Sequence, residues 1–329
     1  GRQIVWFDLP TRQFHIFNIT FWPQDFMLLA WFLIICAFTL FTVTVLLGRI
    51  WCGFGCFQTI WSMIFIELEE VFEGNRNQRI KLDKAPWTWN KIWRKTAKHT
   101  SWVIVAFCTA FTFVGYFNPI REFSREFLTY SADAAPVFWV GMFTLLTYLN
   151  AGKLREQVCL YMCPYARFQS VMFDRDTMIV SYDYNRGEPR GARKRGVDHK
   201  SEGKGDCIDC SFCVQVCPTG IDIRDGLQYE CISCGLCIDA CDEVMNKMDY
   251  PKGLIRFTTE HTLEGGKTKI LRPRFIGYLL AVLIMSSAFN YAVVNRMPLE
   301  VDVIRDRNVL YRETSEGMTE KIYTLKINN

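Results

Sequence analysis

Histidine is scarce in this 329-residue chain, and several long stretches of it lack charged residues altogether. The four histidines stand far apart in the sequence, at His15, His99, His199 and His261. None lies well inside an apolar stretch, where two could face each other across a haem, so a b-type haem is disfavoured. A large basic excess is also lacking: the net charge is +4, and the run 186–204 is interpreted as a linker facing the membrane. No nucleic-acid partner is expected.

Charged residues are missing where a helix would cross a lipid bilayer. Residues 26–47 contain none, residues 275–294 are similar, and residues 101–117 are also uncharged. A fourth apolar run, 137–149, is short and can be extended back across 128–136. A helix needs about 20 apolar residues to span the hydrocarbon core. Four such runs in one chain favour membrane spans over the buried helices of a soluble enzyme.

Lysine and arginine are distributed unevenly between the segments that join these runs. Residues 49–100 hold nine and residues 152–274 hold nineteen, whereas residues 1–25 and 118–136 hold two each. Cytoplasmic loops near membrane spans are enriched in these two residue types. We therefore expect the first two segments to be cytoplasmic, and the other two to lie on the opposite side together with residues 295–329.

Cysteine is abundant in one of the basic segments, where the spacing C-x2-C-x2-C-x3-C occurs twice, over 207–217 and 231–241. Three thiolates at this spacing wrap one 4Fe-4S cubane, and the fourth reaches the neighbouring cluster. The first predicted ligand set is Cys207, Cys210, Cys213 and Cys241, and the second is Cys231, Cys234, Cys237 and Cys217. Pro218 follows the fourth cysteine of the first copy, whereas Asp242 stands there in the second.

Zinc is the competing interpretation, because it also binds four thiolates. Zinc ribbons, however, separate two C-x-x-C knuckles by a longer stretch and do not need a third and fourth cysteine at this spacing. Closely spaced thiols in a reducing cytosol are expected to be metal ligands rather than disulfides. The pattern therefore favours two iron–sulfur clusters.

Two further cysteine pairs stand near the ends of apolar runs. They are Cys52 and Cys56 in W-C-G-F-G-C-F-Q, and Cys159 and Cys163 in V-C-L-Y-M-C-P-Y. The i, i+4 spacing places both sulfurs of a pair on one face of a helix, and a position at a helix start would favour thiolate. We interpret all four as metal or redox residues, with small buried hydrophobes as the alternative.

The two pairs belong to an internal repeat. Each follows a glycine and a basic residue, at 48–49 and at 152–153. Two such modules related by a pseudo-two-fold axis would bring the four thiols together beside the clusters. Cys36 and Cys108 are different, because each is solitary inside an apolar run, and both are interpreted as core thiols.

These motifs, together with F-V-G-Y-F-N-P-I-R-E and L-N-A-G-K-L-R-E-Q, resemble those of the CcoG/FixG (RdxA) family, in the same order and over nearly the whole chain. The resemblance implies a bacterial inner-membrane protein that reduces Cu(II) to Cu(I) for assembly of cbb-type cytochrome c oxidase. Soft thiolates select Cu(I), and iron–sulfur clusters are one-electron carriers suited to this reduction. By motif position, the redox or copper-binding residues would be Cys52, Cys56, Cys159 and Cys163.

The resemblance also implies partners and further segments. The partners would be the oxidase, its copper chaperones, membrane lipid and a cytoplasmic electron donor of unknown identity, and the chain could form a homodimer. The family has one more helix before residue 1. It also has a periplasmic immunoglobulin-like β-domain, whose opening strand would be the I-Y-T-L-K-I alternation near the end of this chain. The family usually has C-x-x-x-C-P at both membrane sites, and Phe57 replaces the first proline.

We therefore expect a mainly α, polytopic membrane bundle with an inserted cytoplasmic ferredoxin domain of the bacterial 2×(4Fe-4S) type. The expected segments are a periplasmic segment (1–25), the membrane bundle (26–180), the cytoplasmic linker and dicluster domain (181–274, core 205–245), the last membrane helix (275–294) and the start of a periplasmic β-domain (295–329). Two other functions stay open: a quinol dehydrogenase resembling the NapH/NosR electron-transfer proteins, and a non-enzymatic assembly scaffold.

Overall fold

The computed structural model describes residues 3–196, 203–295, 300–305, 312–313, 319–320 and 323–328. The chain divides into two compact units, residues 1–281 and residues 282–329, and each is described by itself.

Long apolar helices confirm the predicted membrane protein. Within the described residues, four helices are long and apolar enough to cross a bilayer. They are α1 (Phe26–Leu47), α5 (Trp89–Val114), α7 (Ala134–Thr147) with its continuation η2 (Tyr148–Leu154), and α13 (Pro273–Val294). The α1 helix has the bounds that its charge-free run predicts.

The third span is extended in the opposite direction from the one expected. The backward extension across 128–136 is wrong, because Ile120–Leu128 forms a separate short helix, α6. Pro136 lies in the first turn of α7, where a proline is tolerated, whereas a helix continuing from residue 128 would place it in the interior. The helix gains its length at the other end, where η2 continues it as a π-helix.

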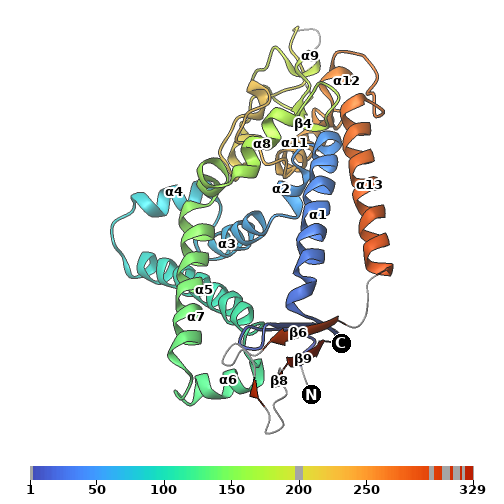
Figure 1. The fold of residues 1–329 in the computed structure, drawn as a ribbon. Helices are drawn as coiled ribbons and strands as arrows, with labels where there is room; N and C mark the ends of the chain where they lie inside the picture. The colour runs from blue at the N-terminus through green and yellow to red at the C-terminus, as the bar shows by residue number, and fades with distance from the viewer. Residues whose placement is uncertain are drawn as a thin grey trace. The chain divides into compact units, whose positions relative to one another are not determined.

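The helix α5 packs against α3 (Phe57–Glu73) and against α7, and α3 also packs against η2 (Figure 1). Trp102 and Phe65 stack at their centre, and the indole of Trp102 donates a hydrogen bond of 2.9 Å to the Phe65 carbonyl. Ala106 and Ala151 complete this buried cluster. Small side chains at these positions let the helix backbones approach closely, as is common in membrane bundles.

A buried ion network ties α3 to α4 (Arg76–Lys84) and to α5. The Glu69 carboxylate lies 2.5 Å from Arg79 and 2.7 Å from Arg155, and 3.4 Å from Lys98. Lys98 also pairs with Glu73 at 2.7 Å. The opposite charges offset the cost of removing each group from water.

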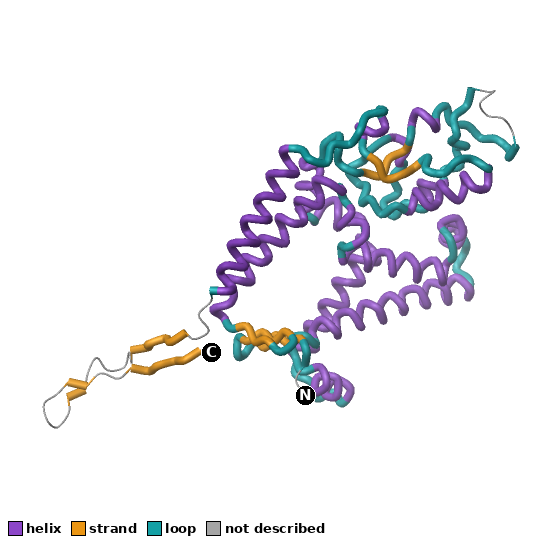
Figure 2. The backbone as a smooth tube through the Cα atoms, turned by 90° about the vertical axis from the view of Figure 1, so that its right-hand side faces the viewer, coloured by secondary structure: helices purple, strands orange, loops and turns teal. Residues whose placement is uncertain are grey.

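The cysteine-rich segment is short of regular structure. Its first and last strands, β4 (Ile179–Tyr182) and β5 (Ile255–Thr258), pair antiparallel and enclose both cysteine motifs, which lie in loops and in α10 (Phe212–Gln215) and α11 (Leu236–Met248) (Figure 2). Val180, Met245 and Leu254 form its buried core. The remaining short helices of this region are α8 (Pro164–Met172), α9 (Tyr184–Gly187), η4 (Ile223–Asp225) and α12 (Glu260–Leu263).

Strands at both ends of the chain form small antiparallel sheets. Near the N-terminus, β1 (Val5–Asp8), β2 (Gln13–Ile16) and β3 (Ile19–Phe21) form a three-stranded sheet that the sequence did not lead us to expect. In the second unit, the predicted strand near the end is present as β9 (Tyr323–Asn328), which pairs with β6 (Glu300–Arg305). Two-residue strands, β7 (Arg312–Glu313) and β8 (Thr319–Glu320), pair with each other.

Candidate iron–sulfur sites and the neighbouring thiols

The first predicted ligand set surrounds one cavity. Cys207, Cys210, Cys213 and Cys241 all line it, together with apolar side chains such as Leu254 and Ile255. Cys241 comes from α11, in the second copy of the motif, and the other three come from the first copy. The fourth cysteine of one copy thus reaches the cavity of the other copy.

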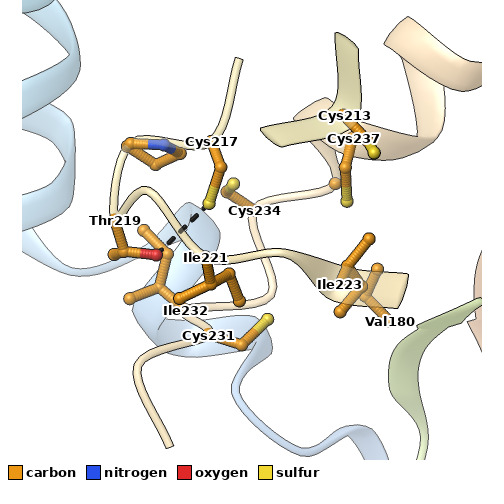
Figure 3. Close-up of a pocket in the computed structure, with 12 residues that line it drawn as sticks. Val180, Cys213, Cys217, Thr219, Ile221, Ile223, Cys231, Ile232, Cys234 and Cys237 are labelled. Carbon is orange, nitrogen blue, oxygen red and sulfur yellow. Dashed lines mark hydrogen bonds between the residues drawn. The ribbon is translucent and has the colours of Figure 1, made fainter. Parts of the chain in front are cut away.

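The second set surrounds a neighbouring cavity. Cys217, Cys231, Cys234 and Cys237 line it, with Val180, Ile221 and Ile223 closing its apolar side (Figure 3). The Cys217 thiol lies 3.3 Å from the Thr219 hydroxyl. Cys213 lines both cavities, which places them next to each other. The ligand assignment itself stays a prediction, and the two cavities support it.

The loops around the two cavities have the same backbone shape. The second and fourth residues after the first cysteine of each copy have positive φ: Asp209 and Ser211 in one copy, Ser233 and Gly235 in the other. Left-handed residues of this kind turn backbone N–H groups to one side and form a concave anion site. The Ser233 and Leu236 amides also donate hydrogen bonds to the sulfurs of Cys231 and Cys234. Such bonds stabilise thiolates bound to a cluster.

The spacing of the sulfurs argues against a single zinc ion. Tetrahedral zinc holds its four sulfurs at about 2.3 Å from the metal, and therefore roughly 4 Å from one another. Among the described residues, no three His, Cys, Asp or Glu side chains lie close enough to hold one metal ion. The thiols instead line two adjacent cavities, four around each.

Burial keeps the free thiols protonated. It raises the pKa of Cys213 and Cys234 to about 11 and that of Cys241 to about 12. Iron would displace these protons, because a thiol bound to a metal is deprotonated.

Asp242 has a structural reason to replace proline. It lies inside α11, where proline would remove a helix hydrogen bond, whereas Pro218 lies in a turn after α10. The Asp242 carboxylate accepts a 2.9 Å hydrogen bond from the Gly253 amide and so fixes the chain before β5.

The four membrane-side thiols occupy matching positions in two modules. Cys52 lies in a short helix, α2 (Ile50–Phe54), and Cys159 lies in a short π-helix, η3 (Val158–Met162). Cys56 and Cys163 are the N-cap residues of α3 and α8, and both have extended backbone conformations. The predicted repeat is therefore present in the local structure.

The two modules differ in how the preceding helix ends. In the first, Gly48 has a φ of +57°, and a side chain there would meet the Met178 carbonyl oxygen at 2.5 Å. In the second, Gly152 stays inside η2, and the positive φ falls on Arg155 instead.

Phe57 replaces proline at the first helical position of α3, where the backbone N–H has no helical partner in any case. The missing proline therefore leaves the helix start intact.

The modules are joined through their thiols and polar side chains. The Cys52 thiol donates a 3.2 Å hydrogen bond to the Gln169 side chain of α8. Burial raises the pKa of Cys52 and of Cys159 to about 11, and each thiol also interacts electrostatically with Cys56. Cys159 interacts in the same way with Cys163. The structure thus brings the four thiols into one neighbourhood.

This neighbourhood touches the second cluster cavity. A Cβ atom at Gly53 would lie 2.7 Å from the Ser233 carbonyl oxygen and 3.0 Å from that of Ile232, in the loop between Cys231 and Cys234. Cys159 shares a small cavity with Thr219 and Ile232, and both of those residues also line the second cluster cavity.

Arg49 links three segments at this contact. Its side chain is 5% exposed, and its guanidinium donates hydrogen bonds to the carbonyls of Cys231 at 3.0 Å and Ala166 at 3.2 Å, and to that of Tyr229. It also lies over the Tyr229 ring, 5.0 Å from its centroid. No contact of Arg49 or Gly53 was predicted from the sequence, which marked Arg49 only as the basic residue of the repeat and Gly53 only by its position between paired cysteines.

Cys36 and Cys108 are not core thiols, so that interpretation is wrong. Both are exposed on the surfaces of membrane-crossing helices. An apolar span buries side chains in lipid as well as in protein, and the sequence pattern is the same for both.

Fold and site together define a membrane-embedded dicluster iron–sulfur redox protein. A family model for 4Fe-4S dicluster domains matches residues 154–260, and a model for the immunoglobulin-like fold at the C-terminus of FixG matches residues 289–329. The nitrogen fixation protein FixG of Rhizobium meliloti is 36% identical over 99% of this chain and 68% of its own length. The proteins RdxB and RdxA of Cereibacter sphaeroides are 39% and 37% identical, over 99% of this chain and 70% of theirs. The chain belongs to the FixG/Rdx family, and no solved structure matches it.

Proposed function

We propose that this protein reduces Cu(II) to Cu(I) during assembly of a cbb-type cytochrome c oxidase, using its iron–sulfur clusters as electron carriers. The observation that carries the proposal is the close approach of Gly53, which lies between Cys52 and Cys56, to the loop of the second cluster cavity. Thiolates are soft ligands that prefer Cu(I), and one electron from a cluster converts Cu(II) to that ion. Copper is thus the substrate of the site.

The chain's own residues prepare this step. The thiols of Cys52, Cys56, Cys159 and Cys163 would draw together around the copper ion, and Cys52 and Cys159 would lose their protons when it binds. Arg49 holds the Cys231 carbonyl and so fixes the second cluster loop against the first module. Its buried positive charge favours an additional electron nearby.

Electrons would pass from the first cluster to the second and then to the thiols. We place both clusters in the cytoplasm on the basis of the lysine and arginine distribution. Residues 295–329 would then lie in the periplasm, where the oxidase and its copper chaperones would receive Cu(I).

The test is an anaerobic Cu(II) reduction assay on the purified chain in nanodiscs, whose clusters are first reduced with dithionite and freed of excess reductant, with a chromogenic Cu(I) chelator. The variant in which Cys52, Cys56, Cys159 and Cys163 are all replaced by serine should keep its iron content and lose most of the copper reduction. The matched control replaces the exposed thiol Cys36 by serine and should reduce copper at the normal rate. If the fourfold variant reduced Cu(II) as fast as the wild type, the proposed role of the thiols would be overturned. If a cluster-free Cys210→Ser/Cys234→Ser variant reduced it as fast as the wild type, the proposed function would be overturned.

A further inference from the structure

A groove among α3, α5 and α7 takes no part in the electron path described above. Its volume is about 880 Å³, within the range of small-molecule sites. Aromatic side chains line much of it, including Phe113 and Phe143, whose rings meet edge to face with centroids 4.9 Å apart. Phe113 and Leu146 are 45% and 42% exposed, so the groove is open toward the surface that lipid covers. A ligand dissolved in the membrane can therefore reach it.

The polar groups of the groove are all uncharged. They include the side chains of Gln58, Thr147 and Asn150, and the lining has no Lys, Arg, Asp or Glu. A phospholipid phosphate would find no cation here, and burying it without one is costly. A ring that carries neutral hydroxyl or carbonyl groups matches the lining better.

Gln58 is positioned to recognise a hydroxyl group. Its side-chain nitrogen donates hydrogen bonds to the carbonyls of Asn150 at 2.9 Å and Arg155 at 3.1 Å, which orients the amide. No hydrogen bond from the described part of the chain reaches its oxygen, Oε1. That oxygen is left to accept a hydrogen bond from a ligand O–H.

Two further cavities lead away from Gln58. The first, which Gln58 also lines, is bounded by Glu156 and by Thr219 and Ile232 of the second cluster cavity. Glu156 in turn lines an open polar groove on the surface, together with Glu69. The first cavity thus joins Gln58 to residues of the second cluster cavity, and the carboxylates connect it to water.

We propose that the groove binds the ring of a membrane hydroquinone, with Gln58 Oε1 accepting a hydrogen bond from one of its hydroxyl groups. Oxidation breaks the two O–H bonds and yields the quinone, two electrons and two protons. One electron goes to each cluster, and the protons pass Glu156 to water. This deepens the proposed function by naming the class of its electron donor, and it explains why two clusters are useful: they divide a two-electron donor into the single electrons that copper accepts.

The experiment uses the full chain in nanodiscs without copper, so its result does not depend on copper reduction. The inert quinone analogue 2-heptyl-4-hydroxyquinoline N-oxide is titrated, and its binding is followed by fluorescence quenching. Thr112→Trp fills the groove from α5, and Leu146→Trp fills it from α7. Ile104→Trp is the matched control, because Ile104 is 56% exposed on α5 and does not line the groove. Iron content and the EPR spectrum after dithionite reduction establish that each variant is folded.

The wild type and Ile104→Trp should bind the analogue alike, and either groove variant should weaken binding at least tenfold. Menadiol should reduce the clusters of the wild type, and reduction should slow in the groove variants to a similar degree. Glu156→Gln should bind the analogue normally but be reduced several-fold more slowly, since it lacks the proton acceptor. Analogue binding that both groove variants leave unchanged overturns the proposal, as does a co-purified phospholipid that the analogue does not displace.

Discussion

Gly53 packs against the backbone of Ser233 so closely that a methyl group at residue 53 would lie 2.7 Å from the Ser233 carbonyl oxygen. Real Cβ atoms do not approach a backbone oxygen to that distance, so one of the two segments would have to move. Gly53 lies between the paired thiols Cys52 and Cys56, and Ser233 lies between two predicted cluster ligands. The glycine therefore sets the separation between the thiols and the second cluster.

Gly53→Ala should slow copper reduction several-fold while leaving the clusters in place. The added methyl group pushes the loop away, at a cost of about 1–3 kcal/mol in the free energy of unfolding, and lengthens the electron path. Single-turnover Cu(II) reduction by the pre-reduced protein measures the effect, with iron content as the check on the clusters. Gly141→Ala is the control, because a Cβ atom there meets nothing within 4 Å. A normal rate in Gly53→Ala would show that the contact does not govern electron transfer.

Arg49→Gln and Arg49→Lys should separate the charge of this residue from its hydrogen bonds. Both variants lose bonds to buried carbonyls, and each should lower the free energy of unfolding by about 2 kcal/mol. Only Arg49→Gln removes the positive charge beside Cys231, and this charge stabilises a reduced cluster. It should therefore make the potential of one cluster more negative by tens of millivolts, since about 1.4 kcal/mol corresponds to 59 mV for one electron. A redox titration followed by EPR measures this, and equal shifts in the two variants would contradict the electrostatic explanation.

The sequence predicted those features that depend on a local pattern. The charge-free run 26–47 became α1 with the same bounds, because lipid imposes a length and composition that few other environments share. The two cysteine motifs are equally local, because three ligands of each cluster lie within seven residues of one another. Patterns of this kind identify the class of protein and the residues around both cavities.

The contacts between distant segments could not be predicted in this way. Arg49 donates to Cys231, 182 residues away, and nothing in the composition of either segment indicates that pairing. The π-helical continuation η2 and the sheet near the N-terminus were missed for a related reason, because packing rather than residue preference selects them. The route from the clusters to the thiols was therefore visible only in the folded structure.

Cys217→Ser should damage the second cluster rather than the first, although it belongs to the first motif. Its thiol lines the cavity formed by Cys231, Cys234 and Cys237. Cys241→Ser should have the reciprocal effect, because that thiol lines the other cavity. EPR spectra of the reduced variants, with iron counted per chain, should each lack the signal of one cluster and retain that of the other. Loss of the same signal in both variants would contradict the prediction that the fourth cysteine of each motif binds the cluster of the other motif.

Glu69→Gln should destabilise the protein by about 3 kcal/mol near neutral pH, because it leaves Lys98, Arg79 and Arg155 without their shared carboxylate. Burial alone would raise the pKa of Glu69, but the hydrogen bond from Arg155 and the surrounding positive charges outweigh it and lower the pKa below its ordinary value of 4.5. A carboxyl group whose pKa is lowered by folding stabilises the fold above its unfolded pKa, and that stability is lost as the pH falls through the folded pKa.

Denaturant unfolding in detergent should therefore show that the wild type is more stable than Glu69→Gln by an amount that is constant above about pH 5 and shrinks below pH 4.5. Glu67→Gln, on the exposed side of the same helix, provides the control and should change stability little at any pH. If the advantage of the wild type over Glu69→Gln were the same at pH 4 as at pH 7, the network would be stabilising the fold by packing rather than by charge.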